Sequence, residues 1–132
     1  MVNVFITVDV EVWCDGWTDI DSKFPQAMRK YIYGDTAQGG FGIPYQLKTL
    51  NEHGLGAAGQ EVQLHLHTEW VDEARAPLLP GVTSKRQHLR HYSLAEQTSL
   101  IAQGADMLVR AGARRPDAFR AGSFGFNRDT ID

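Results

Sequence analysis

The sequence predicts an α/β fold with a largely parallel sheet, on the basis of three segments and of what lies between them. Residues 4–13, 61–67 and 117–124 are interpreted as strands, and each carries polar side chains towards its C-terminal end. Helical patterns lie between the strands. Because parallel strands end at the same rim of their sheet, we expect these polar side chains to meet in a cleft there.

The first predicted strand, residues 4–13, has one aliphatic face and one face that becomes acidic. Its β-branched and aromatic residues favour a strand that is buried on both sides. Asp9 and Glu11 share the second face, with Cα atoms about 6.6 Å apart. Carboxylates that close repel unless a proton, an arginine or a metal ion lies between them. Two solvated acids at the end of a strand are the alternative, and this segment alone leaves both interpretations open.

Length and composition limit the class of protein. The chain has 132 residues, enough for one domain with a core, and its 42% hydrophobic content is ordinary for a soluble protein. A net charge of −3 argues against a nucleic-acid or membrane partner. We expect neither a membrane span nor a signal peptide. The single cysteine, Cys14, excludes an intramolecular disulfide and fits a reducing, cytoplasmic location, and we expect its thiol to be inert.

A long connection, residues 15–42, follows the first strand, and connections of this length at strand ends are often lids or binding loops. Its aromatic side chains suit either a sugar-binding floor or a small satellite core. Residues 34–42 are glycine-rich without the lysine of a phosphate-binding loop, so a flexible connection is predicted. A short helix over residues 43–53 is then predicted from Pro44 in its first turn and Gly54 after its end, and we expect it to pack on the sheet.

The second predicted strand, residues 61–67, carries His65 and His67 on one face and aliphatic side chains on the other. Glu69 follows directly after the strand. A single histidine on a strand is most often a core or surface residue that its neighbours satisfy. Two on one face, followed by an acid, favour a metal site instead.

A loop and a helix precede the third strand. Residues 72–92 are polar and rich in turn residues, and their basic cluster at 85–91 is interpreted as a solvated turn rather than an anion site. A capping box, Ser93 with Glu96, begins a helix that is predicted to run over residues 94–111. The third strand then brings an arginine near its C-terminal end.

Charges at the rim of the predicted sheet do not balance. The acids Asp9, Glu11 and Glu69 lie there, against one cation, Arg120. An uncompensated buried charge costs several kcal/mol, so a divalent cation is expected, and imidazole with carboxylate ligands suits zinc or a neighbouring transition metal. Such an ion lowers the pKa of its bound water to about 7, and a carboxylate can accept the proton of that water. This combination predicts metal-assisted hydrolysis.

Three motifs resemble a known family. Residues 7–11 (Thr-Val-Asp-Val-Glu), 61–68 (Glu-Val-Gln-Leu-His-Leu-His-Thr) and 119–124 (Phe-Arg-Ala-Gly-Ser-Phe) resemble, in order, the first three motifs of the polysaccharide deacetylase (NodB-homology) family. The resemblance implies an irregular (β/α) barrel with a largely parallel sheet, here partial or shortened. It also implies metal-dependent removal of N- or O-acetyl groups from carbohydrates such as chitin or peptidoglycan.

The resemblance further implies roles for the acidic strand and the arginine. Asp9 would be the general base, and Arg120 would hold and orient it. Glu11 would take the place of the second acid of the first motif, which is a metal ligand. In many members the two acids are adjacent, whereas one residue separates them here.

The second motif leaves the histidine ligands open. The family has a second histidine four residues after the first, and that position is Glu69 counted from His65 but Val71 counted from His67. Glu11 and His65 are therefore the first candidate ligands, followed by His67, with Glu69 as a further candidate. The expected cofactor is a divalent metal ion, zinc before other transition metals.

Parts of the family pattern are missing. The sequence has no further strand and helix between residues 54 and 60, and it lacks the acetyl pocket and the Leu-x-His that supplies the general acid. We therefore expect residues 1–132 to form a single, incomplete deacetylase-like domain with little activity alone. Apolar sheet surface left uncovered would favour homo-oligomers.

Two other functions compete with deacetylation. A His-x-His on a strand also marks amidohydrolase-type metal barrels, where it usually lies on the first strand rather than after an acidic one. A non-catalytic carbohydrate-binding or structural remnant of the deacetylase fold is the second alternative. Metal content and activity on acetylated sugars separate the three.

Overall fold

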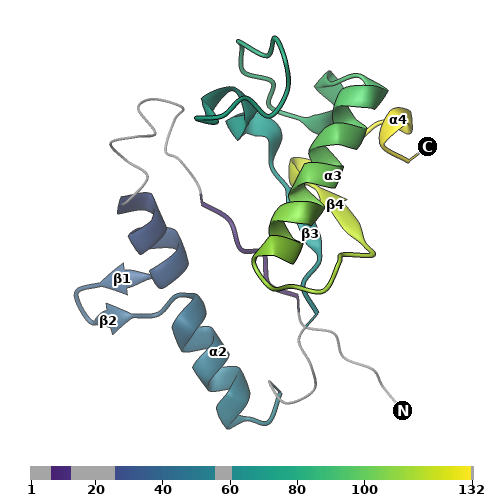
Figure 1. Ribbon diagram of the computed structural model, residues 1–132. Coiled ribbons are helices and arrows are strands. Elements are labelled where there is room, and N and C mark those ends of the chain that lie inside the picture. Colours follow the sequence, from purple (N-terminus) through teal and green to yellow (C-terminus); the bar gives the residue numbers. More distant parts are fainter. Residues whose placement is uncertain (1–6, 13–25, 56–60, 132) are drawn as a thin grey trace. The chain divides into compact units, whose positions relative to one another are not determined.

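The computed structural model describes residues 7–12, 26–55 and 61–131 of the chain. The chain divides into two compact units, Met1–Gln60 and Glu61–Asp132, and each unit is described by itself (Figure 1). Their mixture of helices and strands confirms the α/β class in general terms. The described residues contain one small parallel sheet and no closed barrel.

The first unit contains a π-helix and a hairpin where a flexible connection was predicted. The π-helix η1 (Met28–Tyr33) ends at Gly34, whose φ of 63° lies in the left-handed region. Strands β1 (Asp35–Thr36) and β2 (Gly39–Gly40) then pair antiparallel. The prediction for residues 34–42 is therefore wrong. The two residues that connect the strands, Ala37 and Gln38, are not glycines, and the glycines with positive φ, Gly34 and Gly39, lie on either side of them.

Helix α2 (Ile43–Glu52) agrees with the helix predicted for residues 43–53. Pro44 lies in its first turn, and Gly54 follows its end with a φ of 71°. The start and stop signals in the sequence are thus confirmed. Packing of this helix on a sheet stays a prediction.

Residues 7–12, the described part of the first predicted strand, belong to no strand. Val8 is 50% and Val10 is 58% exposed, so the expected burial of this segment on both sides is wrong. A strand exists only where its backbone groups bond to a neighbouring strand, and the described strands pair β1 with β2 and β3 with β4. Alternating side chains do not by themselves supply such a partner. The remainder of residues 4–13 lies outside the described part of the chain.

The second unit is built on two short parallel strands, β3 (Leu64–Leu66) and β4 (Phe119–Ala121). Helix α3 (Leu94–Arg110) connects them in the chain and packs against β3 (Figure 1). The two approach closely at Gly104, where a Cβ atom would lie 3.0 Å from Cδ1 of Leu64. Both strands and the helix are confirmed at their predicted places, and the strands are shorter than predicted.

Short helices that were not predicted complete the second unit. They are η3 (Thr68–Glu73), η4 (Leu89–His91), η5 (Gly122–Phe124) and α4 (Arg128–Ile131). The first two overlap residues 72–92, which were predicted to be loop. Among the described residues, no helix combines the length and the apolar character needed to cross a membrane.

The core of the second unit draws on this same loop. The buried apolar side chains that form it are Val71, Leu79, Leu89, Tyr92, Leu100 and Ala121. Two short strands offer little apolar surface, so a small unit also buries apolar side chains from its turns. Residues 72–92 are polar on average and still supply part of this core.

Truncating Leu89 should destabilise the second unit. This side chain is 1% exposed, so Leu89→Ala removes core contacts and leaves a cavity, at a cost of about 2–5 kcal/mol in the free energy of unfolding. Leu94→Ala is the matched control, because Leu94 is 49% exposed. Urea denaturation measures both variants, and equal free energies of unfolding would contradict this core.

The predicted capping box at the start of α3 is confirmed. The Ser93 backbone N–H donates to Oε2 of Glu96 at 2.7 Å, and the Glu96 N–H donates to Oγ of Ser93 at 3.4 Å. Hydrogen bonds from the Ser93 backbone and hydroxyl, together with Arg86, hold the pKa of Glu96 below its ordinary value of 4.5. The ionised carboxylate therefore stabilises the first turn of the helix.

This cap should make stability depend on pH. Because the folded-state pKa of Glu96 is lowered, its contribution is present above 4.5 and is lost as the pH falls through the lowered value. Glu96→Gln should therefore lose stability at neutral pH and show a flatter pH dependence in acid. Asp106→Asn, which removes an exposed carboxylate from the same helix, is the control. Chemical denaturation at several pH values measures this, and identical pH dependence in both variants would contradict the role of Glu96.

Candidate metal centre

His65 and His67 lie two residues apart at the end of β3. His65 belongs to the strand, and His67 follows with extended backbone angles (φ −98°, ψ 115°) before η3 begins. Side chains two residues apart on an extended chain point to the same side, so both imidazoles lie on one face, as predicted. Their ring centroids are 4.7 Å apart, and their Nε2 atoms are 3.0 Å apart.

The other nitrogen of each ring donates to a fixed acceptor. His65 Nδ1 lies 3.1 Å from the carbonyl oxygen of Arg120, the residue that pairs with it across the two parallel strands. His67 Nδ1 lies 2.6 Å from Oε1 of Glu69. Carbonyl and carboxylate oxygens accept hydrogen bonds and do not donate them, so both rings carry a proton on Nδ1.

These two hydrogen bonds determine whether the facing Nε2 atoms carry a proton or a lone pair. In a neutral imidazole with its proton on Nδ1, the Nε2 atom holds a lone pair. Two such lone pairs 3.0 Å apart repel unless a proton or a metal ion lies between them. Two nitrogens bound to one tetrahedral zinc ion would be about 3.3 Å apart, given Zn–N distances of about 2.0–2.1 Å. The pair of rings therefore fits a divalent ion after a small separation of the two nitrogens.

Glu69 is a buried acid, 6% exposed. Burial alone would raise the pKa of Glu69, but the hydrogen bond with His67, helped by the backbone, holds this pKa below its ordinary value. The carboxylate is consequently ionised at neutral pH. It is the charged acceptor for the Nδ1 proton of His67.

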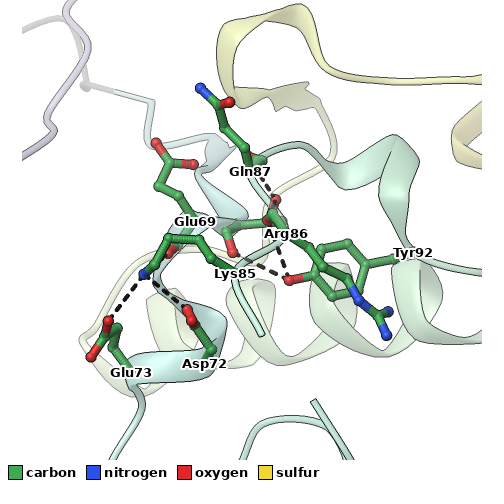
Figure 2. Close-up of polar contacts among 8 residues, drawn as sticks. Glu69, Asp72, Glu73, Lys85, Arg86, Gln87 and Tyr92 are labelled. Atoms are coloured by element: carbon green, nitrogen blue, oxygen red, sulfur yellow. Dashed lines mark hydrogen bonds and ion pairs between the residues drawn. The ribbon is translucent and has the colours of Figure 1, made fainter. Parts of the chain in front are cut away.

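Lys85 anchors the turn that carries Glu69 (Figure 2). Its ammonium donates to the backbone carbonyl of Glu69 at 2.9 Å and to the carboxylates of Asp72 and Glu73 at 3.0 and 3.1 Å. Burial opposes the charge, yet these acids hold the pKa of Lys85 above its ordinary value. The turn is thus fixed by a charged side chain that is ionised at neutral pH.

Thr68 and Tyr92 connect the same turn to the neighbouring loop through hydrogen bonds. The Thr68 hydroxyl donates to the Gln87 carbonyl at 3.3 Å, and the Tyr92 hydroxyl donates to the Thr68 carbonyl at 3.4 Å. Burial raises the pKa of Tyr92, so this hydroxyl remains a donor. Residues 85–91 were interpreted as a solvated turn, and that is wrong for Lys85, which is partly buried and bound to acids.

Two glycines after β4 make room for imidazoles, and sequence reasoning missed both. A Cβ atom at Gly122 would lie 2.8 Å from Cγ of His67, and one at Gly125 would lie 2.6 Å from Cβ of His88. Between them, Ser123 and Phe124 each have a φ of 51°, which is uncommon outside glycine. The Gly-Ser-Phe-Gly spacing directly after a strand with a polar end was the available signal.

The predicted site residues fall into two groups. His65, His67 and Glu69 lie together in the second unit, and Arg120 joins them through its backbone carbonyl. The Arg120 guanidinium carbon lies 5.8 Å from the ring centroid of Phe124. The acids of the first motif belong to the first unit and are exposed, and their roles stay predictions.

Comparisons of the chain with protein-family models, with curated proteins and with solved structures found no match.

The histidine pair should bind one zinc ion. Zinc titration with a competing chromophoric chelator should detect one site, and the His65→Ala/His67→Ala double variant should lose it because both Nε2 ligands are gone. The His53→Ala/His91→Ala double variant also removes two imidazoles and should bind zinc as the parent does. Equal or negligible zinc binding by the parent and the first double variant would contradict the site.

Proposed function

We propose that the protein is a metal-dependent hydrolase that removes N- or O-acetyl groups from a carbohydrate. The observation that carries this proposal is the pair of Nε2 atoms 3.0 Å apart, each on a ring whose Nδ1 donates to a fixed acceptor. Hydrogen bonds of this kind are the usual outer partners of metal-binding histidines. The substrate class comes from the resemblance of three motifs to polysaccharide deacetylases.

Three side chains are the proposed ligands. The family resemblance adds Glu11 to the His65 and His67 pair, so the proposed set supplies one carboxylate oxygen and two imidazole nitrogens. Mixed nitrogen and oxygen ligands suit zinc or a neighbouring transition metal. Three protein ligands also leave a coordination position for water or substrate, as catalytic zinc sites require.

The remaining chemistry is assigned to two further residues. When bound, a divalent ion supplies a Lewis acid that lowers the pKa of water to about 7. Asp9 is the proposed general base that accepts a proton from the attacking water, and Arg120 is proposed to orient the Asp9 carboxylate. His65 and His67 bind as neutral rings, so they do not reduce the positive charge at the site.

Acetate release tests the substrate class. The zinc-loaded protein is incubated separately with acetylated chito-oligosaccharides and with O-acetylated sugars, beside the His65→Ala/His67→Ala variant. Release that requires both the metal and the histidines supports the proposal. Release is expected to be slow, because the sequence lacks the general acid of the family pattern, so it is followed over long incubations and compared with release by the histidine variant. Metal binding with release from either substrate no faster than that of the variant would overturn the proposal and favour an amidohydrolase-type enzyme or a non-catalytic protein.

Substitutions of the two acids of the first motif should have different effects on zinc binding and on the rate of acetate release. Asp9→Asn should lower the rate of acetate release by about 10²–10⁴-fold and leave zinc bound, because a base is lost and the ligands remain. Glu11→Ala should weaken zinc binding. Zinc affinity and acetate release are measured for both variants. Loss of zinc in Asp9→Asn with zinc retained in Glu11→Ala would show that the roles are exchanged.

A further inference from the structure

We infer that Glu69 is a positioning residue, which holds His67 in the Nδ1–H form so that Nε2 of this ring is turned towards the metal. The inference rests on the metal centre of the proposed function and is independent of the substrate. In this inference Glu69 binds Nδ1 of His67 and is not itself a metal ligand.

The order of the groups carries the inference. The two nitrogens of an imidazole point away from each other, so an acceptor on Nδ1 and an ion on Nε2 lie on opposite sides of the ring. Oε1 of Glu69 is 2.6 Å from Nδ1 of His67, and Nε2 of the same ring is 3.0 Å from Nε2 of His65. Glu69 therefore acts on the metal position through the imidazole that lies between them.

The ring of His67 is also held from the side. A Cβ atom at Gly122 would come within 2.8–2.9 Å of its Cγ, Cδ2 and Nδ1 atoms, and the side chain is 18% exposed. A ring flip would replace Nδ1 by a carbon atom beside the Glu69 carboxylate and break the 2.6 Å hydrogen bond. A buried carboxylate without a donor is costly, so the flipped ring is disfavoured.

Charge placement supports the same role. Figure 2 shows the Glu69 side chain directed away from the Lys85 ammonium, which instead lies between Asp72 and Glu73. Lys85 reaches Glu69 at its backbone carbonyl, so it fixes the turn rather than neutralising the carboxylate. The negative charge of Glu69 is thus directed to His67, where it makes Nε2 a stronger electron-pair donor to a cation.

Three variants test the inference. Glu69→Ala removes the acceptor, and Glu69→Gln keeps an amide oxygen as a neutral acceptor of nearly the same size. Glu73→Gln is the matched control, because it removes a carboxylate from the same turn that pairs with Lys85 rather than with His67. The isosteric Glu69→Gln variant and the control keep the comparison valid if the alanine variant folds poorly.

The first measurement reports the tautomer of His67 without any metal. Two-bond proton–nitrogen correlation spectra are recorded at about pH 8, where neutral imidazole predominates. The parent and Glu73→Gln should show Nδ1–H. Glu69→Ala should shift towards the Nε2–H form that free imidazole favours, and Glu69→Gln should lie between the two. A ring that is merely packed in place would not change its tautomer in this order.

The second measurement is the zinc dissociation constant, obtained by competition with a chelator. It should rise by about 10–100-fold in Glu69→Ala, rise less in Glu69→Gln and stay unchanged in Glu73→Gln.

Two results would overturn the inference. Persistence of Nδ1–H in Glu69→Ala together with weaker zinc binding is the pattern of a direct ligand. An unchanged zinc dissociation constant in Glu69→Ala would show that the carboxylate does not act on the metal position. A wrong substrate class would appear instead as zinc binding without acetate release, and it would leave both measurements interpretable.

Discussion

The structure of the second unit depends on two imidazole Nε2 atoms that lie 3.0 Å apart. Both atoms can offer a lone pair to one cation only if each ring keeps its proton on Nδ1, and this requires a hydrogen-bond acceptor beside each Nδ1. The register of β3 against β4 supplies the first acceptor, because it places the Arg120 carbonyl opposite His65. The turn of η3 supplies the second through Glu69. A short parallel pair and one turn of helix therefore fix both rings.

A series of polar contacts connects the turn that carries Glu69 to the start of α3. Glu96 caps the helix and also binds Arg86 at 3.1 Å. The residue after Arg86 accepts the Thr68 hydroxyl, and Thr68 directly precedes Glu69. Since Tyr92 packs in the apolar core and donates to the Thr68 carbonyl, the polar support and the core share a residue. The stability of this loop and the position of Glu69 beside His67 are thus coupled through a few hydrogen bonds.

Sequence patterns predicted those features that local geometry dictates. His65 and His67 share a face because extended chains repeat every two residues, and α3 begins where its capping box predicts. The Arg120 carbonyl was beyond prediction, because every residue has the same backbone acceptor and only the strand register selects one. Counting positions made Glu69 a candidate ligand, whereas the direction of its side chain depends on the η3 turn. Residues 7–12 failed as a strand because alternation does not encode a pairing partner.

The turn after β4 has a strained backbone, and this turn brings Gly122 against His67, whose Nε2 atom faces that of His65. Ser123 and Phe124, each at a φ of 51°, cost about 1–3 kcal/mol apiece in backbone strain. Hydrogen bonds close the turn on both sides of them, from Gly125 N–H to the Gly122 carbonyl at 2.9 Å and from Arg90 N–H to the Gly125 carbonyl at 2.8 Å. Ending a strand requires no such strain. Bringing the Gly122 backbone against His67 does require a tight turn, and this close contact restricts movement of the ring, so less ordering would remain to oppose binding of the proposed metal ion.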